Sequence, residues 1–171
     1  MNELDHIWLR ELKKKYPDSF KSAKVLELGS YNVNGTVRDH FEYCTFIGVD
    51  WREGKDVDVV SMAHETILEK EYFDTLISDN MFEHDPYWEK SINNSLQFLK
   101  KDGMIFFRFA GPDTVEHNLD GDPSKENRYY PKSKEVVVNF LESLGVKVLD
   151  SSSESNPSLA GQMISIVAQK V

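Results

Sequence analysis

Apolar positions along the chain recur with two different periods, which separates the expected helices from the expected strands. Helical spacing predicts helices over residues 1–17, 34–43, 86–101 and 133–145, and a short helix or loop over 63–71. Short apolar runs predict strands over residues 23–28, 45–50, 56–60, 72–78, 104–110, 146–151 and 162–169. Strands that alternate with helices in this way favour a parallel sheet.

The last two strands break this alternation. Residues 152–161, which separate 146–151 from 162–169, have the composition of a loop and contain no helical pattern. A parallel crossover usually needs a helix, whereas a short loop joins antiparallel neighbours. We therefore expect an α/β fold with a Rossmann-like seven-stranded sheet and helices on both faces. The sheet should be mostly parallel, with 162–169 as its one antiparallel strand.

Length and charge narrow the class of protein. The chain has 171 residues, of which 40% are hydrophobic, so we expect residues 1–171 to form a single domain with a true core. Its net charge of −9 does not favour nucleic acid or an anionic membrane as partner. No apolar run is long enough to span a membrane, and the single cysteine, Cys44, fits a reducing compartment. We expect a cytoplasmic protein of open oligomeric state.

The stretch "VLELGSYNVNG", residues 25–35, reads as a strand that turns sharply into a helix. Ligands of open α/β sheets bind at such strand ends. A dinucleotide fingerprint would require glycine at positions 31 and 34, where Tyr31 and Asn34 stand, and a P-loop would require a lysine, which the stretch lacks. Glu27 at the strand end would repel a pyrophosphate. The stretch therefore favours a ligand that carries positive charge.

This stretch resembles the first motif of the class I methyltransferases that depend on S-adenosyl-L-methionine (SAM), in which an apolar run and an acid precede a glycine-rich turn. Three further segments resemble later landmarks of that family: "FIGVD" at 46–50, "FDTLISDNMFEH" at 73–84 and "LKKDGMIFFRF" at 99–109. The final helix-free hairpin is also similar. The resemblance covers roughly residues 20–171 and is closest to the small-molecule, or type 11, branch of the family.

The resemblance implies SAM as cofactor and assigns residues to it. Glu27 would lie beneath the cationic end, and Asp50 would accept hydrogen bonds from both ribose hydroxyls. Met62 would pack on the adenine, at a position where many relatives carry an acid. Asp79 and Asn80 would line the methionine end. The cofactor residues implied by the resemblance are Glu27, Gly29, Ser30, Tyr31, Gly35, Asp50, Trp51, Met62, Ala63, Asp79 and Asn80.

The acceptor implied by the resemblance is a small molecule methylated at an O, N or C atom. The "NPPY" signature of amino-nitrogen methyltransferases is missing after the fourth expected strand, where "DNMF" stands, which argues against nucleobase or glutamine amides. His84 is the candidate catalytic residue, because a histidine near the methyl group could remove a proton from the acceptor. It could equally cap the next helix or pack against SAM.

Two departures from the family pattern keep other functions open. The middle glycine of the first turn is replaced, and Met62 takes the place of an acid, so a non-catalytic SAM-binding module is the alternative to an enzyme. A nicotinamide-dependent oxidoreductase is the third hypothesis, which Tyr31 and Asn34 oppose.

The polar segment 111–131 is long enough to form a lid over the acceptor. It also contains four potential metal ligands, His117, Asp120, Asp122 and Glu126. Their spacing matches no metal-binding motif, so we expect no metal site there.

Overall fold

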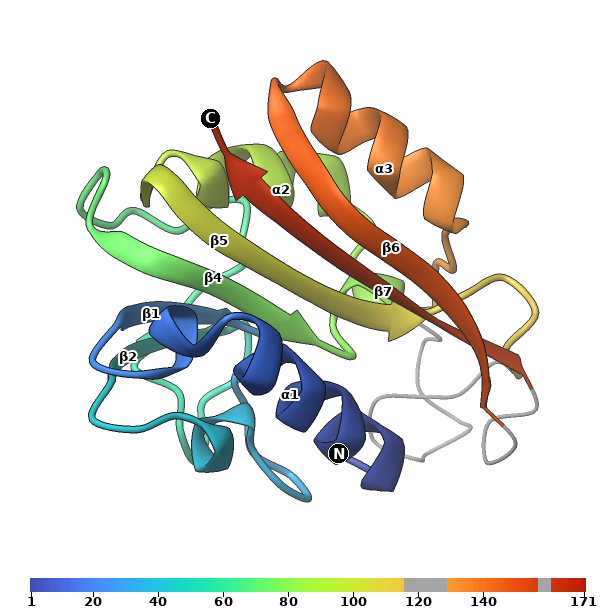
Figure 1. The fold of residues 1–171 in the computed structure, drawn as a ribbon, viewed down its shortest axis with the longest axis horizontal. Coiled ribbons are helices and arrows are strands. Elements are labelled where there is room, and N and C mark those ends of the chain that lie inside the picture. The colour runs from blue at the N-terminus through green and yellow to red at the C-terminus, as the bar shows by residue number, and fades with distance from the viewer. Residues whose placement is uncertain (116–128, 157–160) are drawn as a thin grey trace.

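A seven-stranded sheet forms the centre of the computed structural model, which describes residues 1–115, 129–156 and 161–171 (Figure 1). The strand order is β3-β2-β1-β4-β5-β7-β6. The strands are β1 (Lys24–Leu28), β2 (Thr45–Asp50), β3 (Val59–Val60), β4 (Phe73–Asp79), β5 (Leu99–Ala110), β6 (Val146–Asn156) and β7 (Gly161–Lys170). β7 pairs antiparallel with both β5 and β6, and the other pairings are parallel. The predicted mixed seven-stranded sheet is thereby confirmed.

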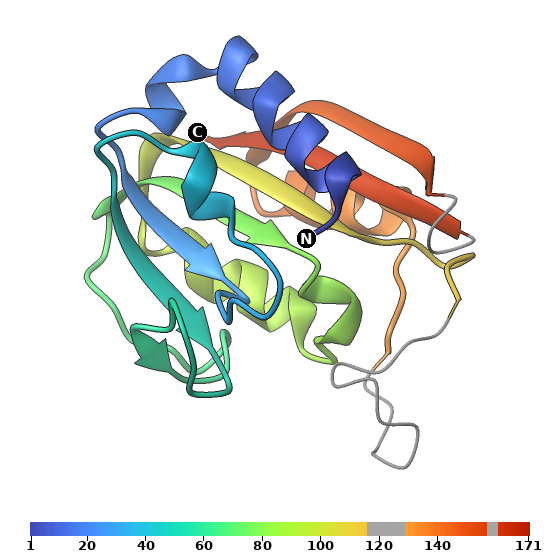
Figure 2. The ribbon, with the colours of Figure 1, turned by 90° about the horizontal axis from the view of Figure 1, so that it is seen from below.

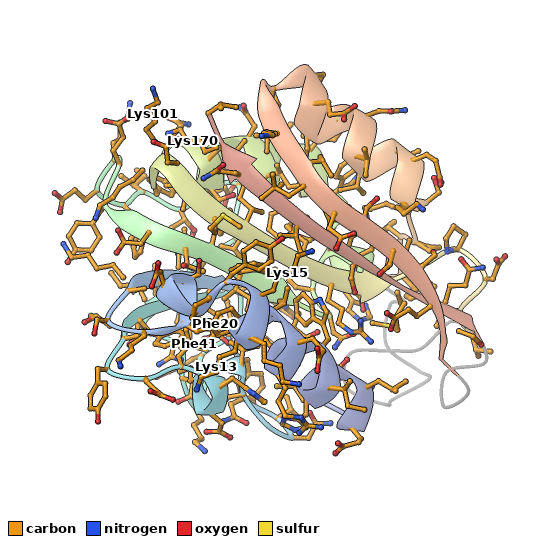
Figure 3. All side chains as sticks on the ribbon, viewed as in Figure 1. Lys13, Lys15, Phe20, Phe41, Lys101 and Lys170 are labelled. Carbon is orange, nitrogen blue, oxygen red and sulfur yellow. The ribbon has the colours of Figure 1, made fainter. Side chains whose placement is uncertain are left out.

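Helices pack on this sheet in two layers (Figure 2). Within the described residues the α-helices are α1 (Glu3–Lys15), α2 (Trp88–Leu96) and α3 (Lys134–Ser143), with 3-10 turns η1 (Pro17–Phe20), η2 (Val37–His40) and η3 (Phe82–His84). α1 and η1 cover one face, where Phe20 stacks on Phe41 with ring centroids 4.3 Å apart (Figure 3). α2 and α3 cover the other face. Each layer buries its own apolar cluster.

Strand β5 shows why the central strands carry apolar residues on both of their faces. Phe106 belongs to the cluster under α1, whereas its neighbour Phe107 belongs to the cluster under α2 and α3. Successive side chains of a strand point to opposite faces, so a strand covered on both faces needs apolar residues on both of them.

The helix predicted for residues 34–43 is wrong. The structure has only η2 in this segment, followed by an extended residue at Phe41. Asn32 Oδ1 accepts from Gly35 N–H at 3.0 Å, which closes a turn before the helical residues. Thr36 is the N-cap of η2, since its Oγ1 accepts from Arg38 N–H at 3.2 Å, so the helical turn begins only after Thr36. Residues 63–71, which were predicted to form a short helix or a loop, form turns and no helix.

Strands β5, β6 and β7 are longer than predicted. Leu99 already pairs with Phe73, and a register shift leads to the pair Thr75–Met104, so "KKDG" is a bulge within β5 and not a turn. The predicted loop 152–161 contributes residues to both strands of the final hairpin. β6 lies at the edge of the sheet, where serine and charged side chains can stay exposed while the backbone ladder continues.

A buried ion pair fixes α1 on the sheet. Arg108 Nε on β5 donates to Asp5 Oδ1 at 3.1 Å, and both side chains are 0% exposed. Arg108 Nη1 also donates to Ser165 Oγ on β7 at 2.7 Å. The second oxygen of Asp5 accepts from Asn2 N–H at 2.7 Å and completes the capping box of α1. The first turn of α1 is therefore tied to the middle of the sheet.

Replacing Arg108 by methionine should lower the free energy of unfolding by about 3–5 kcal/mol, because it leaves the Asp5 carboxylate buried without its counter-charge. Urea denaturation measures the loss. The control is Arg10→Met, which removes the exposed Arg10–Glu3 pair and should cost less than about 1 kcal/mol. Equal losses in the two variants would show that the buried pair does not anchor α1.

Candidate functional site

A cavity of about 470 Å³ opens where β1, β2 and β4 end and where the first turn of α1 approaches them. This is the edge at which open α/β sheets bind ligands. All residues that the sequence assigned to the cofactor or to catalysis line this cavity: Glu27, Gly29, Ser30, Tyr31, Gly35, Asp50, Trp51, Met62, Ala63, Asp79, Asn80 and His84. The fold therefore brings the predicted residues together, and their roles remain predictions.

Backbone donors of the turn after β1 already have acceptors. Gly29 N–H and Ser30 N–H both donate to Val49 O, at 2.9 and 3.2 Å. Tyr31 N–H donates to Asp50 Oδ2 at 3.2 Å. A phosphate-binding turn needs such N–H groups to point at the ligand, usually at the start of a helix, and here only the 3-10 turn η2 follows. The turn is not built as a pyrophosphate cradle.

Gly29 is required by the packing of the protein itself. Its φ is +77°, a region that L side chains rarely adopt, and a Cβ here would lie 2.5 Å from Met81 Cβ. The resemblance to methyltransferases implied Gly29 as a cofactor residue. In the structure the Met81 side chain occupies the space next to Gly29. This contact packs the segment after β4 against the turn after β1.

Glu27 is paired with a cation of the protein, which the sequence analysis did not foresee. Arg38 Nε donates to Glu27 Oε2 at 2.9 Å, and Arg38 Nη2 donates to Asp56 O at 2.6 Å. Burial nevertheless raises the pKa of Glu27 to about 7, because loss of hydration outweighs the favourable effect of Arg38. Arg38 lies in a polar segment that was predicted to be helical. Only its charge could have suggested that it pairs with Glu27.

Asp50 ends β2 and keeps room for further hydrogen bonds. Its Oδ2 accepts from Tyr31 N–H at 3.2 Å and its Oδ1 from Arg52 N–H at 2.9 Å. A carboxylate has about four acceptor positions, so two remain for a ligand. The Arg52 guanidinium lies over the rings of Tyr31 and Trp51, at 4.8 and 5.2 Å from their centroids. This side of the cavity combines an acceptor pair with a flat aromatic wall.

The end of β4 contributes a half-buried acid. Asp79 Oδ1 accepts from Asn80 Nδ2 at 3.0 Å, whereas Asp79 Oδ2 has no hydrogen-bond partner among the described residues. Burial raises the pKa of Asp79 well above its usual range, and the neighbouring Asp5 carboxylate raises it further. Asn80 adopts a φ of +57° and donates its N–H to Arg108 O at 2.9 Å. The local backbone is therefore bent to present this pair at the cavity.

Glu83 and His84, which end the segment "FDTLISDNMFEH", have different surroundings in the structure. His84 lines the cavity, and its ring centroid lies 5.9 Å from that of Tyr129. Glu83 is fully buried, and burial raises its pKa to about 7. Asp85 holds the start of α2, since its oxygens accept from Tyr87 N–H at 2.7 Å and Ser91 Oγ at 2.5 Å.

Comparison with solved structures places this arrangement in a known fold. Over 95% of the chain, the structure superposes with a TM-score of 0.74 and 14% identity on 76% of the 1,6-didemethyltoxoflavin-N1-methyltransferase of Burkholderia thailandensis, which was solved with 1,6-didemethyltoxoflavin and S-adenosylhomocysteine bound. A SAM-dependent methyltransferase of Mesorhizobium loti gives a TM-score of 0.69 at 14% identity, covering 94% of this chain and 96% of its own. The chain has the SAM-dependent methyltransferase fold.

The same comparison shows that the methyltransferase fold does not by itself determine the reaction. A (4+2)-cyclase, SpnF, matches with a TM-score of 0.70 at 12% identity, covering 95% of this chain and 79% of its own. No model of a protein family and no curated protein matches the sequence. The residues at the cavity must therefore decide the function.

The sequence analysis missed several residues that line the cavity. Asn2 is the N-cap of α1 and Asp5 lies in its first turn, and the sequence analysis treated this helix apart from the motifs. Val33, Arg52 and Asp85 are neighbours of predicted residues and also line the cavity. Adjacency to a motif was the one signal that could have found them.

Some predictions fall on residues that the structure leaves undescribed. His117, Asp120, Asp122 and Glu126 lie outside the described residues, and so does most of the predicted lid 111–131. The described part of the chain contains no group of three or more His, Cys, Asp or Glu side chains that could hold a metal ion. No helix in the described ranges is long and apolar enough to cross a membrane.

Glu27→Gln should become more stable relative to wild type as pH rises. The folded-state pKa of Glu27, about 7, lies above the ordinary value of 4.5, so its stabilising contribution is complete below pH 4.5 and is lost as pH rises through 7. Urea denaturation at pH values between these limits gives the free energy of unfolding of each protein. The difference between variant and wild type should shift by up to about 3 kcal/mol in favour of the variant as pH rises. The exposed Glu53→Gln serves as control. A difference that does not vary with pH would contradict the assignment.

Proposed function

We propose that the protein is a SAM-dependent methyltransferase that transfers a methyl group to an O, N or C atom of a small molecule. The observation that carries this proposal is the combination of three acids, Glu27, Asp50 and Asp79, at a cavity whose β1 turn has already used its N–H groups. A dinucleotide needs those donors for its pyrophosphate, whereas SAM has no phosphate and carries positive charge. The shared fold of methyltransferases supports the same reading.

The cofactor would lie across the ends of β1, β2 and β4. Asp50 would accept from the ribose hydroxyls, and Met62 would pack against the adenine. Asp79 and Asn80 would border the methionine end. Glu27 is already bound to Arg38, so it would act on the cationic end through its field or through water, and not as an isolated charge.

SAM would supply a methyl carbon that is already activated by the sulfonium sulfur. The task of the protein is then to hold the acceptor in line with that carbon and to exclude water. An acceptor of high pKa also needs a group that takes its proton. His84, at the strand-four side of the cavity, is the candidate for that role.

We further propose that residues 1–171 work as one domain in the cytoplasm, that segment 111–131 covers the acceptor, and that nucleic acid is not a partner. The net charge of −9 supports the last point, because it opposes binding to a polyanion. A non-catalytic SAM-binding module is the second candidate, favoured by the replaced middle glycine. Binding of S-adenosylhomocysteine without turnover on a metabolite panel would identify it.

Asp50→Asn should weaken the binding of S-adenosylhomocysteine by roughly tenfold to a hundredfold, because hydrogen bonds to a charged acceptor contribute about 1.5–3 kcal/mol. Isothermal titration calorimetry measures this. Glu53→Gln, in the same loop but away from the cavity lining, should bind like wild type. If wild type binds NADH at millimolar concentration but neither SAM nor its product, the proposed function is wrong.

His84→Ala should lower turnover by about a hundredfold if His84 removes a proton, with little change in the affinity for SAM. Steady-state kinetics with SAM titration separates the two effects. Equal losses of turnover and affinity would assign His84 to the cofactor pocket, and unchanged turnover would remove it from the mechanism.

A further inference from the structure

The Arg38 side chain joins β1, β2 and the segment between β2 and β3. Its Nε donates to Glu27 Oε2 on β1 at 2.9 Å. Its Nη2 donates to Asp56 O at 2.6 Å and to Asp58 Oδ2 at 3.2 Å, both in the segment before β3. The guanidinium carbon lies 4.9 Å from the centre of the Phe46 ring on β2. Arginine suits such a position because its planar guanidinium holds several N–H donors in fixed directions.

The partners of Arg38 are themselves tied to the strands around them. Asp58 Oδ2 also accepts from Gly48 N–H on β2 at 2.7 Å. Asp56 Oδ2 accepts from Asn32 Nδ2, in the turn after β1, at 2.6 Å. A Cβ at Gly48 would lie 2.4 Å from Arg38 Nη2, so β2 leaves open the space that the guanidinium fills. The turn after β1 and the segment before β3 are therefore held against each other around Arg38.

Arg38 stands behind the cavity, and its neighbours face it. Glu27 and Tyr31 on the β1 side and Asp50 on the β2 side all line the cavity, whereas Arg38 is not among the described lining residues. Arg38 can therefore act on a bound ligand through the residues that it holds. Stability alone does not account for an arginine here, because apolar side chains of similar volume usually stabilise a partly buried position as well as an ion pair does.

The charge of Glu27 depends on this arrangement. Burial has the largest effect and raises the pKa of the Glu27 carboxyl, and the carboxylates of Asp56 and Asp58 raise it further. Arg38 opposes them through its hydrogen bond and its charge, and the resulting pKa is about 7. Without Arg38 the Glu27 carboxyl would stay protonated, and hence neutral, to higher pH.

We propose that Arg38 is a positioning residue for the cofactor: it keeps Glu27 oriented and ionised, so that this carboxylate attracts the α-ammonium group that SAM and S-adenosylhomocysteine share. This inference rests on the proposed function, which supplies SAM as the ligand. Removing Arg38 would then weaken cofactor binding by neutralising Glu27, and the loss would depend on pH.

Isothermal titration with S-adenosylhomocysteine from about pH 6 to 9 tests the inference. The affinity of wild type should increase as pH rises through the Glu27 pKa of about 7. Arg38→Gln should move this increase to higher pH by about one to three units and weaken binding roughly tenfold at neutral pH, because it removes the opposite charge that favours the carboxylate. Arg38→Lys retains the positive charge and should restore most of the wild-type pH dependence.

A second background separates positioning from a purely structural role. Glu27→Gln should abolish the increase in affinity, and Arg38→Gln added to it should then weaken binding much less than it does in wild type. Equal, pH-independent losses in both backgrounds would overturn the inference. Should Arg38→Gln not fold, as judged by urea denaturation, Glu27→Gln still decides, because a wild-type pH dependence retained in that variant would overturn the inference.

Other charged groups at the cavity are the same in every variant, so the comparison isolates Glu27. The titratable or charged groups among its described lining residues are the Met1 amino group, Asp5, Asp50, Arg52, Asp79, His84 and Asp85.

The matched control is Arg10→Gln, which changes an exposed arginine paired with Glu3, away from the cavity lining. It should bind S-adenosylhomocysteine like wild type at every pH. Absent binding by wild type at every pH would overturn the proposed function and this inference with it. Binding with one pH dependence in all variants would overturn the role of Arg38 alone.

Discussion

The buried ion pair between Asp5 and Arg108 is the interaction on which the rest of the structure depends. It joins the first turn of α1 to β5 across 103 positions of sequence, and neither side chain is exposed. Charges so deeply buried are tolerated only when they are paired and hydrogen-bonded, so α1 cannot lift from the sheet without leaving a bare charge behind. Because α1 is held there, Asn2 and Asp5 become a wall of the cavity. The contact that holds α1 on the sheet therefore also shapes the cavity.

Electrostatic cost is concentrated around that cavity. Burial raises the pKa of both Glu27 and Asp79, and for Glu27 it does so despite the hydrogen bond from Arg38. A core built for stability alone would place apolar side chains at these strand ends. Acids with raised pKa values at these strand ends are reasonable if a cationic ligand binds beside them, which is the physical basis of the proposed function. Sequences commonly depart from the rules of stable folding at functional sites.

The β1 turn shows how backbone geometry separates ligand classes that share a fold. Its donors bond to Val49 O and to the Asp50 carboxylate, and only a 3-10 turn follows. A phosphate would find few N–H groups and no helix N-terminus, whereas a phosphate-free nucleoside needs neither. Fold similarity alone does not identify the reaction, because a (4+2)-cyclase shares the fold with methyltransferases. The acids at the strand ends therefore carry more of the functional argument than the superposition does.

The sequence by itself determined the number of strands, through short apolar segments, and the antiparallel direction of β7, through the helix-free segment before it. It also showed the acids at the strand ends, because they directly follow or end the apolar runs. Pairing between distant segments was decided by the tertiary structure: Asp5 with Arg108, Glu27 with Arg38, and Met81 over Gly29. The same holds for the helix predicted at 34–43, which is only the short turn η2 in the structure, with the Arg38 side chain bound to Glu27 and to Asp56 O. Such contacts leave no periodic signal, since they depend on which residues folding brings together.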